Sequence, residues 1–495
     1  MSIIPRKKNH LVLHLLPCAL ALALQSGCAV GPDFVPPTAS APENWTSWRS
    51  SDDSLKMPVL SEKMPANWWE IFGDPILDRI QSHALESSPD IHTAALRYAQ
   101  ARTQRIGIEA LSSPAVNLTG GVIRQRQSEY GAGTRLIDAL GGSREKLASS
   151  LAEPFTLYQA GFDASWELDL WGRVQRSLEA VDADITRQAE YLRMARLALI
   201  SEVARNYFEL RMVQRKIALA REDMTALEER TALVNAKSSG GLIGQLENEQ
   251  QHAELEEVKA RLPTLLAEEG DKIGRIALLL GEPPGQLVSL LRPKVDSAEV
   301  SLPDLSLGLP SEVALHRPDI RAAEARLRAA TANTGVAEAD LYPSIRLGTK
   351  FGYESYLSGE FAGWGSRAWS IGPSINLPIF DRGRRKSVVH LRELEQKEAA
   401  VSYQKTVLQA WKEIDDALNR YAAEQKKVVG LKAREDRARR AWQLSQARYA
   451  SGLTDYVAVI DSQRYYAQAR RELVESEGVL QICFVATQKA IGNAP

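Results

Sequence analysis

Apolar and polar residues alternate in two short stretches of the chain, and each stretch runs into a long segment with a helical period. The alternation at 161–170 and at 369–378 has a period of two, which predicts β-strands. Over 174–239 the apolar residues recur at intervals of three, four or seven, with one change of register on the way. A single helix of that length would span about 100 Å at about 1.5 Å per residue, far more than an ordinary globular domain needs.

Landmark residues repeat along the chain at matching intervals. The interval from Gly172 to Gly241 equals that from Gly383 to Gly452, and the interval from Pro89 to Pro114 equals that from Pro318 to Pro343. Because the four pairs keep their order, they indicate an internal duplication. Each half is expected to contain a helix, a β-hairpin, a long helix and a returning helix.

The duplication organises the whole chain. We expect a signal peptide at 1–27, a strap at 28–74, repeat 1 at 75–280, a proline-rich connector at 281–311 and repeat 2 at 312–491. In repeat 1 the hairpin, long helix and returning helix are expected at 115–170, 174–239 and 242–280, and in repeat 2 at 344–378, 384–450 and 453–491.

Prolines refine the helix predictions. Pro75 suits the first turn of a helix, which is expected to run to about Ala110 and to have its counterpart at 312–340. Pro263 lies inside a returning helix and is expected to kink or break it.

The N-terminus has the features of a secretory signal. A basic segment at 6–8 precedes an apolar core at 11–24, which is too short for a transmembrane helix. The following Leu-Gln-Ser-Gly-Cys ends at Cys28 and resembles a bacterial lipoprotein box, with Gln25 where a branched apolar residue is usual. Attachment of diacylglycerol and palmitate at Cys28, or ordinary cleavage that leaves a free thiol, both stay open. Ala29, in place of an aspartate, favours sorting to the outer membrane.

Composition excludes several function classes. The formal net charge of −1 and the pI of about 6.7 argue against a nucleic-acid-binding protein. Three cysteines give no disulfide framework, and seven histidines show no metal spacing. Because no catalytic or cofactor fingerprint occurs either, we expect no enzyme, no metal and no cofactor.

Charge is distributed unevenly between the two repeats. The segment 247–271 is mostly acidic, and the segment 426–448 is mostly basic. Solvated helix faces would explain this, and so would complementary packing between helices of one assembly.

The strands decide between a soluble and a membrane fold. Each is about nine or ten residues long, which suffices to cross a bilayer as tilted β, and each has one apolar and one polar face. A soluble sandwich would show the same alternation, but the signal peptide and the lipoprotein box favour a membrane.

In hydrocarbon a sheet must close into a barrel, and four strands cannot close. Three copies would supply twelve strands around a useful lumen. The predicted fold is therefore an α+β membrane protein: a homotrimeric twelve-stranded transmembrane β-barrel, with four strands per chain. A long periplasmic α-helical barrel with six-fold pseudo-symmetry is expected to continue it.

Four groups of residues then point to a family. They are Cys-Ala-Val-Gly-Pro-Asp-Phe at 28–34, Trp68-Trp69 with Phe-Gly-Asp-Pro at 72–75, the junctions Asp-Leu-Trp-Gly-Arg at 169–173 and Phe-Asp-Arg-Gly-Arg at 380–384, and Tyr449 and Gly452 with Asp-Ser-Gln-Arg at 461–464. Together they resemble TolC-type outer-membrane factors, most closely the lipoprotein branch, similar to OprM and NodT, of resistance-nodulation-division (RND) efflux systems. The resemblance covers essentially the whole mature chain.

The resemblance implies a function and partners. It implies a trimeric outer-membrane channel with a mixed equatorial domain and a large periplasmic portion. Such a channel exports small toxic compounds, antibiotics among them, from an inner-membrane RND pump through a periplasmic adaptor, or membrane fusion protein. It is a passive conduit and not an enzyme.

The resemblance also implies roles for particular residues. Gly241, Tyr449 and Gly452 match helix-hairpin tips, where the family closes its pore, although the glycines could equally be plain helix caps. Asp461 matches an aspartate of a constricting ring, with Arg464 one turn further on and Glu247 at the equivalent acidic position of repeat 1. A solvated surface aspartate is the other interpretation of Asp461.

Other positions complete the set of site residues. Thr454 and Ala458 replace the arginine and second aspartate found in TolC, so the network that closes the aperture must differ in this chain. The expected strand-to-helix junctions are Gly172, Arg173, Gly383 and Arg384.

Two other functions remain compatible with the sequence. A TolC-like exit duct for type I protein secretion would share every feature above. A periplasmic coiled-coil scaffold without a pore would explain the helices, but it would leave the four strands without a role.

Overall fold

The computed structural model describes most of the mature chain. It covers residues 29–37, 49–50, 52–55, 65–131, 144–241, 244–292, 313 and 316–494. The predicted signal peptide and Cys28 lie outside the described residues. Contacts divide the chain into two compact units, one with residues up to 35, 100–185 and 326–399, and one with the remainder.

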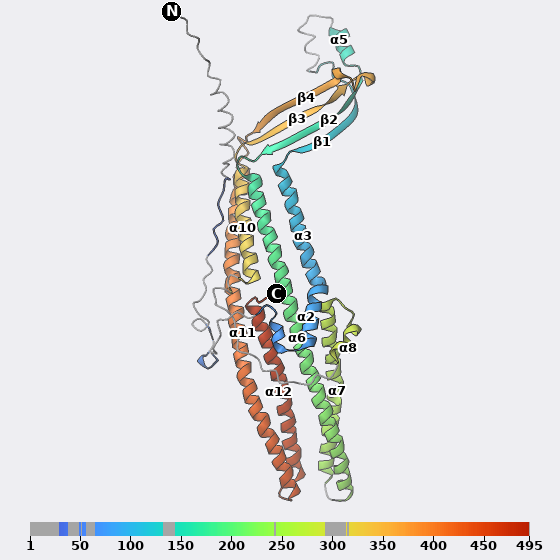
Figure 1. Ribbon diagram of the computed structural model, residues 1–495, viewed down its shortest axis with the longest axis vertical. Helices are drawn as coiled ribbons and strands as arrows, with labels where there is room; N and C mark the ends of the chain where they lie inside the picture. Colours follow the sequence, from blue (N-terminus) through green and yellow to red (C-terminus); the bar gives the residue numbers. More distant parts are fainter. Residues whose placement is uncertain are drawn as a thin grey trace, which may run out of the picture. The chain divides into compact units, whose positions relative to one another are not determined.

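The first unit contains one antiparallel sheet. Its strands follow the order of the sequence (Figure 1): β1 Ala115–Gln125, β2 Phe155–Leu168, β3 Ser344–Ser355 and β4 Arg367–Asn376. A short helix, α5 Arg144–Leu151, lies in the connection between β1 and β2. Since β1 and β4 each have one neighbour, both edges of the sheet are unpaired among the residues that the structure describes.

The register separates the two faces of the sheet. Phe162 in β2 lies opposite Phe351 in β3, which in turn lies opposite Trp369 in β4. These side chains are 57%, 52% and 69% exposed, so no other described residue covers this part of the apolar face. On the other face Asp163 lies opposite Lys350. The predicted alternation is thus realised in one continuous apolar face and one polar face.

A glycine pair in the middle of the sheet allows unusually close strands. Gly161 and Gly352 face each other across β2 and β3. A Cβ at Gly161 would lie 2.6 Å from the Gly352 Cα, so no side chain fits at either position. A cavity of about 430 Å³ opens there, lined by both glycines together with Gln159, Lys350, Glu354 and Ser370. These four side chains belong to the polar face, so the polar face is the hollowed one.

Helices make up the rest of the structure. They are α2 Pro75–Ser87, α3 Pro89–Glu109, α6 Arg173–Ser239, α7 Gln245–Leu280, α8 Val288–Leu291, α10 Pro318–Ala339, α11 Arg384–Ala450 and α12 Tyr456–Ala490. Helix α6 pairs with α7, and α11 with α12, as two hairpins (Figure 1).

One helix prediction was wrong, and the break expected as one outcome in a second helix is absent. The expected single helix from Pro75 to Ala110 is interrupted at Ser88, which has an extended backbone with φ −61° and ψ 127°. Proline disfavours a helical conformation in the residue before it, so Pro89 explains the interruption. By contrast Pro263 does not break α7, which continues from Gln245 to Leu280. Pro263 is exposed, so water can reach the carbonyl that loses its helical hydrogen bond.

The core of the second unit gathers aromatic side chains from distant segments. Phe484 in α12 is completely buried and contacts Trp68, Phe72 and Tyr421, with ring centroids 5.5–6.3 Å apart. Trp68 and Phe72 belong to the 3-10 helix η2, Trp68–Phe72, which precedes α2. The Asp74 carboxylate caps α2 by accepting hydrogen bonds from the Ile76 and Leu77 amides at 2.9 and 3.3 Å. This core therefore joins the N-terminal strap to both halves of the chain.

Candidate functional site

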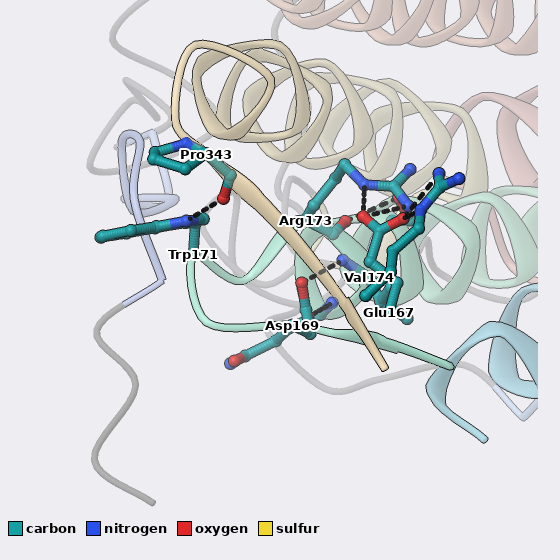
Figure 2. A network of polar contacts seen from close by, with 9 residues as sticks. Glu167, Asp169, Trp171, Arg173, Val174 and Pro343 are labelled. Carbon is teal, nitrogen blue, oxygen red and sulfur yellow. Dashed lines mark hydrogen bonds and ion pairs between the residues drawn. The ribbon is translucent and has the colours of Figure 1, made fainter. Parts of the chain in front are cut away.

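Each long helix begins at a junction that an aspartate caps. At the first junction, the Asp169 carboxylate accepts hydrogen bonds from the amides of Val174 at 3.0 Å and Gln175 at 2.9 Å (Figure 2). Gly172 has φ +74°, the left-handed conformation that glycine adopts without strain. The strand therefore turns into the helix within four residues.

The second junction repeats this design with different details. The Asp381 carboxylate accepts from the amides of Gly383 at 3.1 Å and Arg385 at 3.2 Å. Gly383 has φ +80°, and Arg382 is the one non-glycine residue in the described part of the chain with a positive φ, at 54°. An aspartate therefore caps the N-terminus of both long helices.

Polar contacts brace the first junction, as Figure 2 shows. Glu167 accepts hydrogen bonds from both Arg173 and Arg346, each at 3.0 Å. The Trp171 indole donates to the Pro343 carbonyl at 2.8 Å, so the turn is tied to the chain that enters β3. A cavity of about 230 Å³ lies beside this network.

The two arginines predicted for the junctions are not equivalent. Arg173 is held by Glu167, whereas Arg384 is exposed and its guanidinium has no recorded partner among the described residues. At the second junction the next residue, Arg385, does this work by pairing with Asp381 at 3.7 Å and donating to the Asp340 carbonyl. Arg173 and Arg384 are each the first residue of their long helix, but different arginines make the polar contacts at the two junctions.

The segment that follows Cys28 docks on the first junction. The Val30 amide donates to the Trp171 carbonyl at 3.1 Å, and the Arg176 guanidinium contacts the Val30 carbonyl at 3.1 Å and the Asp33 carboxylate at 2.8 Å. A Cβ at Gly172 would lie 2.5 Å from the Ala29 Cβ, so glycine is needed there for contact as well as for conformation. Arg176 was missed from the sequence, where it looks like any charged residue of a helix.

The tip glycines end their helices. Gly241 has φ +71° and Gly452 has φ +70°. After α11, the Leu453 amide donates to the Arg448 carbonyl at 2.9 Å and the Gly452 amide donates to the Tyr449 carbonyl at 3.0 Å. This pair of bonds is a Schellman motif, so the glycines act as helix caps, which also suits a hairpin tip.

Aromatic and cationic side chains link the two tips. The Tyr449 ring lies 5.1 Å from the Tyr456 ring, and the Lys237 ammonium of α6 lies 5.4 Å from the Tyr449 ring centroid. This geometry is that of a cation–π contact. Burial raises the pKa of the Tyr456 phenol, which therefore stays neutral near pH 7.

The predicted aperture residues are not gathered into one network within the chain. Arg464 forms an ion pair with Glu254 of α7. The exposed Asp461 carboxylate has no recorded hydrogen bond or ion pair among the described residues, and Glu247 lies against Gly244 instead. Lys237 and Glu254 were missed because each contacts a residue more than 200 positions away, which no local spacing reveals.

Searches for other kinds of site gave negative results in the described ranges. No helix found there is long and apolar enough to span a membrane. In that same part of the chain, no three His, Cys, Asp or Glu side chains are grouped so as to hold a metal ion.

Comparison with known proteins gives matches over nearly the full chain. A family model described as outer membrane efflux protein matches residues 80–282 and 309–493. The outer membrane protein OprJ of Pseudomonas aeruginosa is 30% identical, over 96% of this chain and 95% of OprJ. A Salmonella typhimurium protein named probable outer membrane lipoprotein SilC is 26% identical, over 94% of this chain and 96% of its own length. The solved structure of the outer-membrane channel OprN superposes with a TM-score of 0.80 at 29% identity, covering 94% of this chain and 99% of that chain.

The two junction glycines provide a matched test of the docked N-terminal segment. An alanine at either position should lower the free energy of unfolding by about 1 kcal/mol, because the left-handed backbone conformation is strained for a residue with a Cβ. Only at Gly172 does the new methyl collide with Ala29, because nothing lies within 4 Å of the position at Gly383. Gly172→Ala should therefore lower the thermal unfolding midpoint more than Gly383→Ala, and it should speed proteolysis between residues 29 and 35. Equal effects of the two substitutions on both measurements would contradict the docking.

Proposed function

The chain belongs to the outer membrane efflux protein family and acts in efflux across the outer membrane, and we propose that three copies form its channel. In this proposal the channel is a passive conduit that carries small toxic compounds, antibiotics included, from the periplasm to the exterior. A large periplasmic portion extends inward from the membrane. The resemblance drawn from the sequence motifs is confirmed by the family match.

The observation that carries the proposed pore is the sheet with two unlike faces and two unpaired edges. Every residue of β1 and of β4 is exposed. An unpaired edge in hydrocarbon costs several kcal/mol for each unsatisfied backbone group. Pairing β4 of one copy with β1 of the next removes all such edges once the ring closes.

Three copies fit this requirement. They give a barrel of twelve strands, an even number as in single-chain bacterial barrels, and wide enough for a lumen. The apolar face then meets lipid, and the hollowed polar face with Asp163 and Lys350 lines water. Because α6 and α11 have 67 residues each, we attribute them to duplicated halves that form a periplasmic helical barrel with six-fold pseudo-symmetry.

The tips are the proposed periplasmic aperture. Three Asp461 carboxylates around one axis would repel one another and attract cations. Within each chain, the Lys237–Tyr449 contact and the Arg464–Glu254 pair hold the two hairpins together. We propose that they take over the closing role that Thr454 and Ala458 cannot supply.

Partners and lipid follow from the same proposal. An inner-membrane RND pump and a periplasmic adaptor would deliver substrates, and exposed leucines at the tips, Leu246 and Leu453, offer the adaptor apolar contacts. Cys28 would carry diacylglycerol and palmitate. Because residues 29–33 are fixed at the end of β2, an acyl chain on Cys28 would enter the membrane beside the barrel.

Gene deletion tests efflux against protein secretion. Cells without the protein should become sensitive to small toxic compounds, and a plasmid copy should restore resistance, because the exit from the periplasm is lost and regained. The secreted proteins, compared by mass spectrometry, should not change. Unchanged sensitivity together with lost secreted proteins would instead indicate a type I secretion duct.

A substitution at the aperture tests the carboxylate ring. Asp461→Ala should raise the leak conductance of the purified channel in planar bilayers several-fold, because one ring of fixed charge and bulk is removed. Asp416→Ala is the matched control, since that half-exposed carboxylate pairs with Lys412 on its own helix, far from the tip. If both variants conduct like the wild type, Asp461 is an ordinary surface residue.

Metabolic labelling tests the lipid anchor. Cys28→Ser should abolish incorporation of radioactive palmitate, since the thiol that accepts diacylglycerol is gone. Cys483→Ser should leave labelling unchanged, because Cys483 is half-buried in α12 and its burial raises the pKa of the thiol. Label that persists in Cys28→Ser would refute lipidation at this position.

A further inference from the structure

Two helices of the second unit, α7 and α11, each have an outer face that is exposed in the described part of the chain. Helix α12 pairs with α6 through Arg470–Glu222 at 2.7 Å and Lys216–Glu475 at 2.9 Å, and with α7 through Arg464–Glu254. Helix α12 therefore lies against the other hairpin (Figure 1). Near the tips α11 also contacts α6, through Lys237–Tyr449 and Arg230–Trp442. Among the described residues, no ion pair joins α7 to α11. The outer faces of α7 and α11 are therefore the two free flanks of this four-helix array.

The flank of α7 is acidic and narrow. Exposed positions recur along it with a spacing close to 3.5 residues, as in a helix that packs along a partner helix. They form what we name the acidic stripe: Glu249, Ala253, Glu256, Ala260, Ala267 and Asp271. Its alanines would allow a second helix to approach closely. Between 247 and 271 the chain has eight acidic and two basic side chains.

The flank of α11 has the same spacing and the opposite charge. Its exposed positions form the basic stripe: Lys426, Ala433, Arg437, Arg440, Leu444 and Ala447. Between 426 and 448 the chain has eight basic and two acidic side chains. Lys426, Arg437 and Arg440 have no recorded ion pair within the described chain. Leu444 is 66% exposed, which is a cost for a helix that stays in water.

The two stripes also match in position. Lys237 of α6 contacts Tyr449 of α11, so the tips of the two hairpins lie level. The chain runs away from the tip along α7 and toward the tip along α11. With the tips at the same height, the two helices are therefore antiparallel. Counted from the tips, Glu256 then falls beside Arg440 and Asp271 beside Lys426. Both pairs join opposite charges.

We propose that the acidic stripe of α7 in one copy packs against the basic stripe of α11 in a second copy. This inference rests on the proposed trimer, in which the two flanks of neighbouring copies meet. The occupant is a second copy and not another protein, because both complementary surfaces are present on this chain and a ring of copies satisfies both at once. The interface would explain why the duplicated halves carry opposite charge.

Zero-length cross-linking with a carbodiimide tests the contact. The reagent joins an amine to a carboxylate only where the two touch, so it should link Lys426 of one chain to an acidic residue at 268–271 of another. Lys426→Arg keeps the charge but removes the amine, so it should lose the linked peptide while the protein stays trimeric by native mass spectrometry. Lys405→Arg, an exposed site on the same helix outside the stripe, should leave the link intact.

The outcomes separate this inference from the proposed channel. A trimer that yields no chain-to-chain link between these stripes overturns the inference and leaves the channel standing. A monomeric protein overturns both. A link that forms only when an adaptor is added, and then to the adaptor, would assign the stripes to that partner and overturn the inference too.

Charge reversal supplies a second measurement. Arg440→Glu and Glu256→Arg should each lower the temperature at which the trimer dissociates, because like charges would then face each other between copies. The double variant restores opposite charges and should recover most of the loss. Losses that simply add in the double variant would show that the two residues do not meet.

Discussion

An unpaired backbone group cannot be left in hydrocarbon, and that constraint shapes the rest of this protein. The sheet of four strands has one apolar face, on which Phe162, Phe351 and Trp369 are more than half exposed, and two edges that pair with no other strand in the described part of the chain. Such a sheet exposes apolar side chains in water and unpaired backbone groups in lipid, and both are unfavourable. In the proposed trimer, repetition around an axis would remove the edges and would place the apolar face against lipid. The glycine pair Gly161–Gly352 permits a close approach of β2 and β3, and its lack of side chains leaves room for the cavity on the polar face.

The long helices depend on the same closure. Each grows from a strand through a turn in which an aspartate caps the first amides and a glycine has positive φ. In the proposed ring, the distance between neighbouring strands would therefore set the distance between the helices that follow them. In the proposed ring, the acidic stripe of α7 in one copy would lie beside the basic stripe of α11 in the next. This arrangement would account for their opposite charges. Closing the sheet and closing the helices would be one event.

Periodicity made much of this predictable from the sequence. The alternation of Phe162 and Asp163, and the long uninterrupted period after Gly172, determine strands and helices through local geometry alone. The aspartates and glycines of both junctions could also be found from the sequence, because they lie between the end of a strand pattern and the start of a helix pattern. The break at Ser88 could also have been predicted, because Pro89 disfavours a helical conformation in the residue directly before it.

Contacts between distant segments could not be predicted in this way. Nothing near Lys237 in the sequence indicates Tyr449, and nothing near Arg176 indicates that it holds Val30. The pairing of Arg385 with Asp381 was likewise not predicted, because side-chain direction decides which guanidinium reaches the carboxylate. These pairings depend on the tertiary fold, which local patterns restrict but do not determine.

Closure of the sheet between copies is the claim on which the proposed channel stands. It is tested most directly by electron cryomicroscopy of the purified protein in lipid nanodiscs, at a resolution that separates strands. We expect three chains and a closed barrel, with β4 of each chain hydrogen-bonded to β1 of the next. A particle in which β1 or β4 keeps a free edge inside the membrane, or in which the four strands lie outside it, would contradict the proposal.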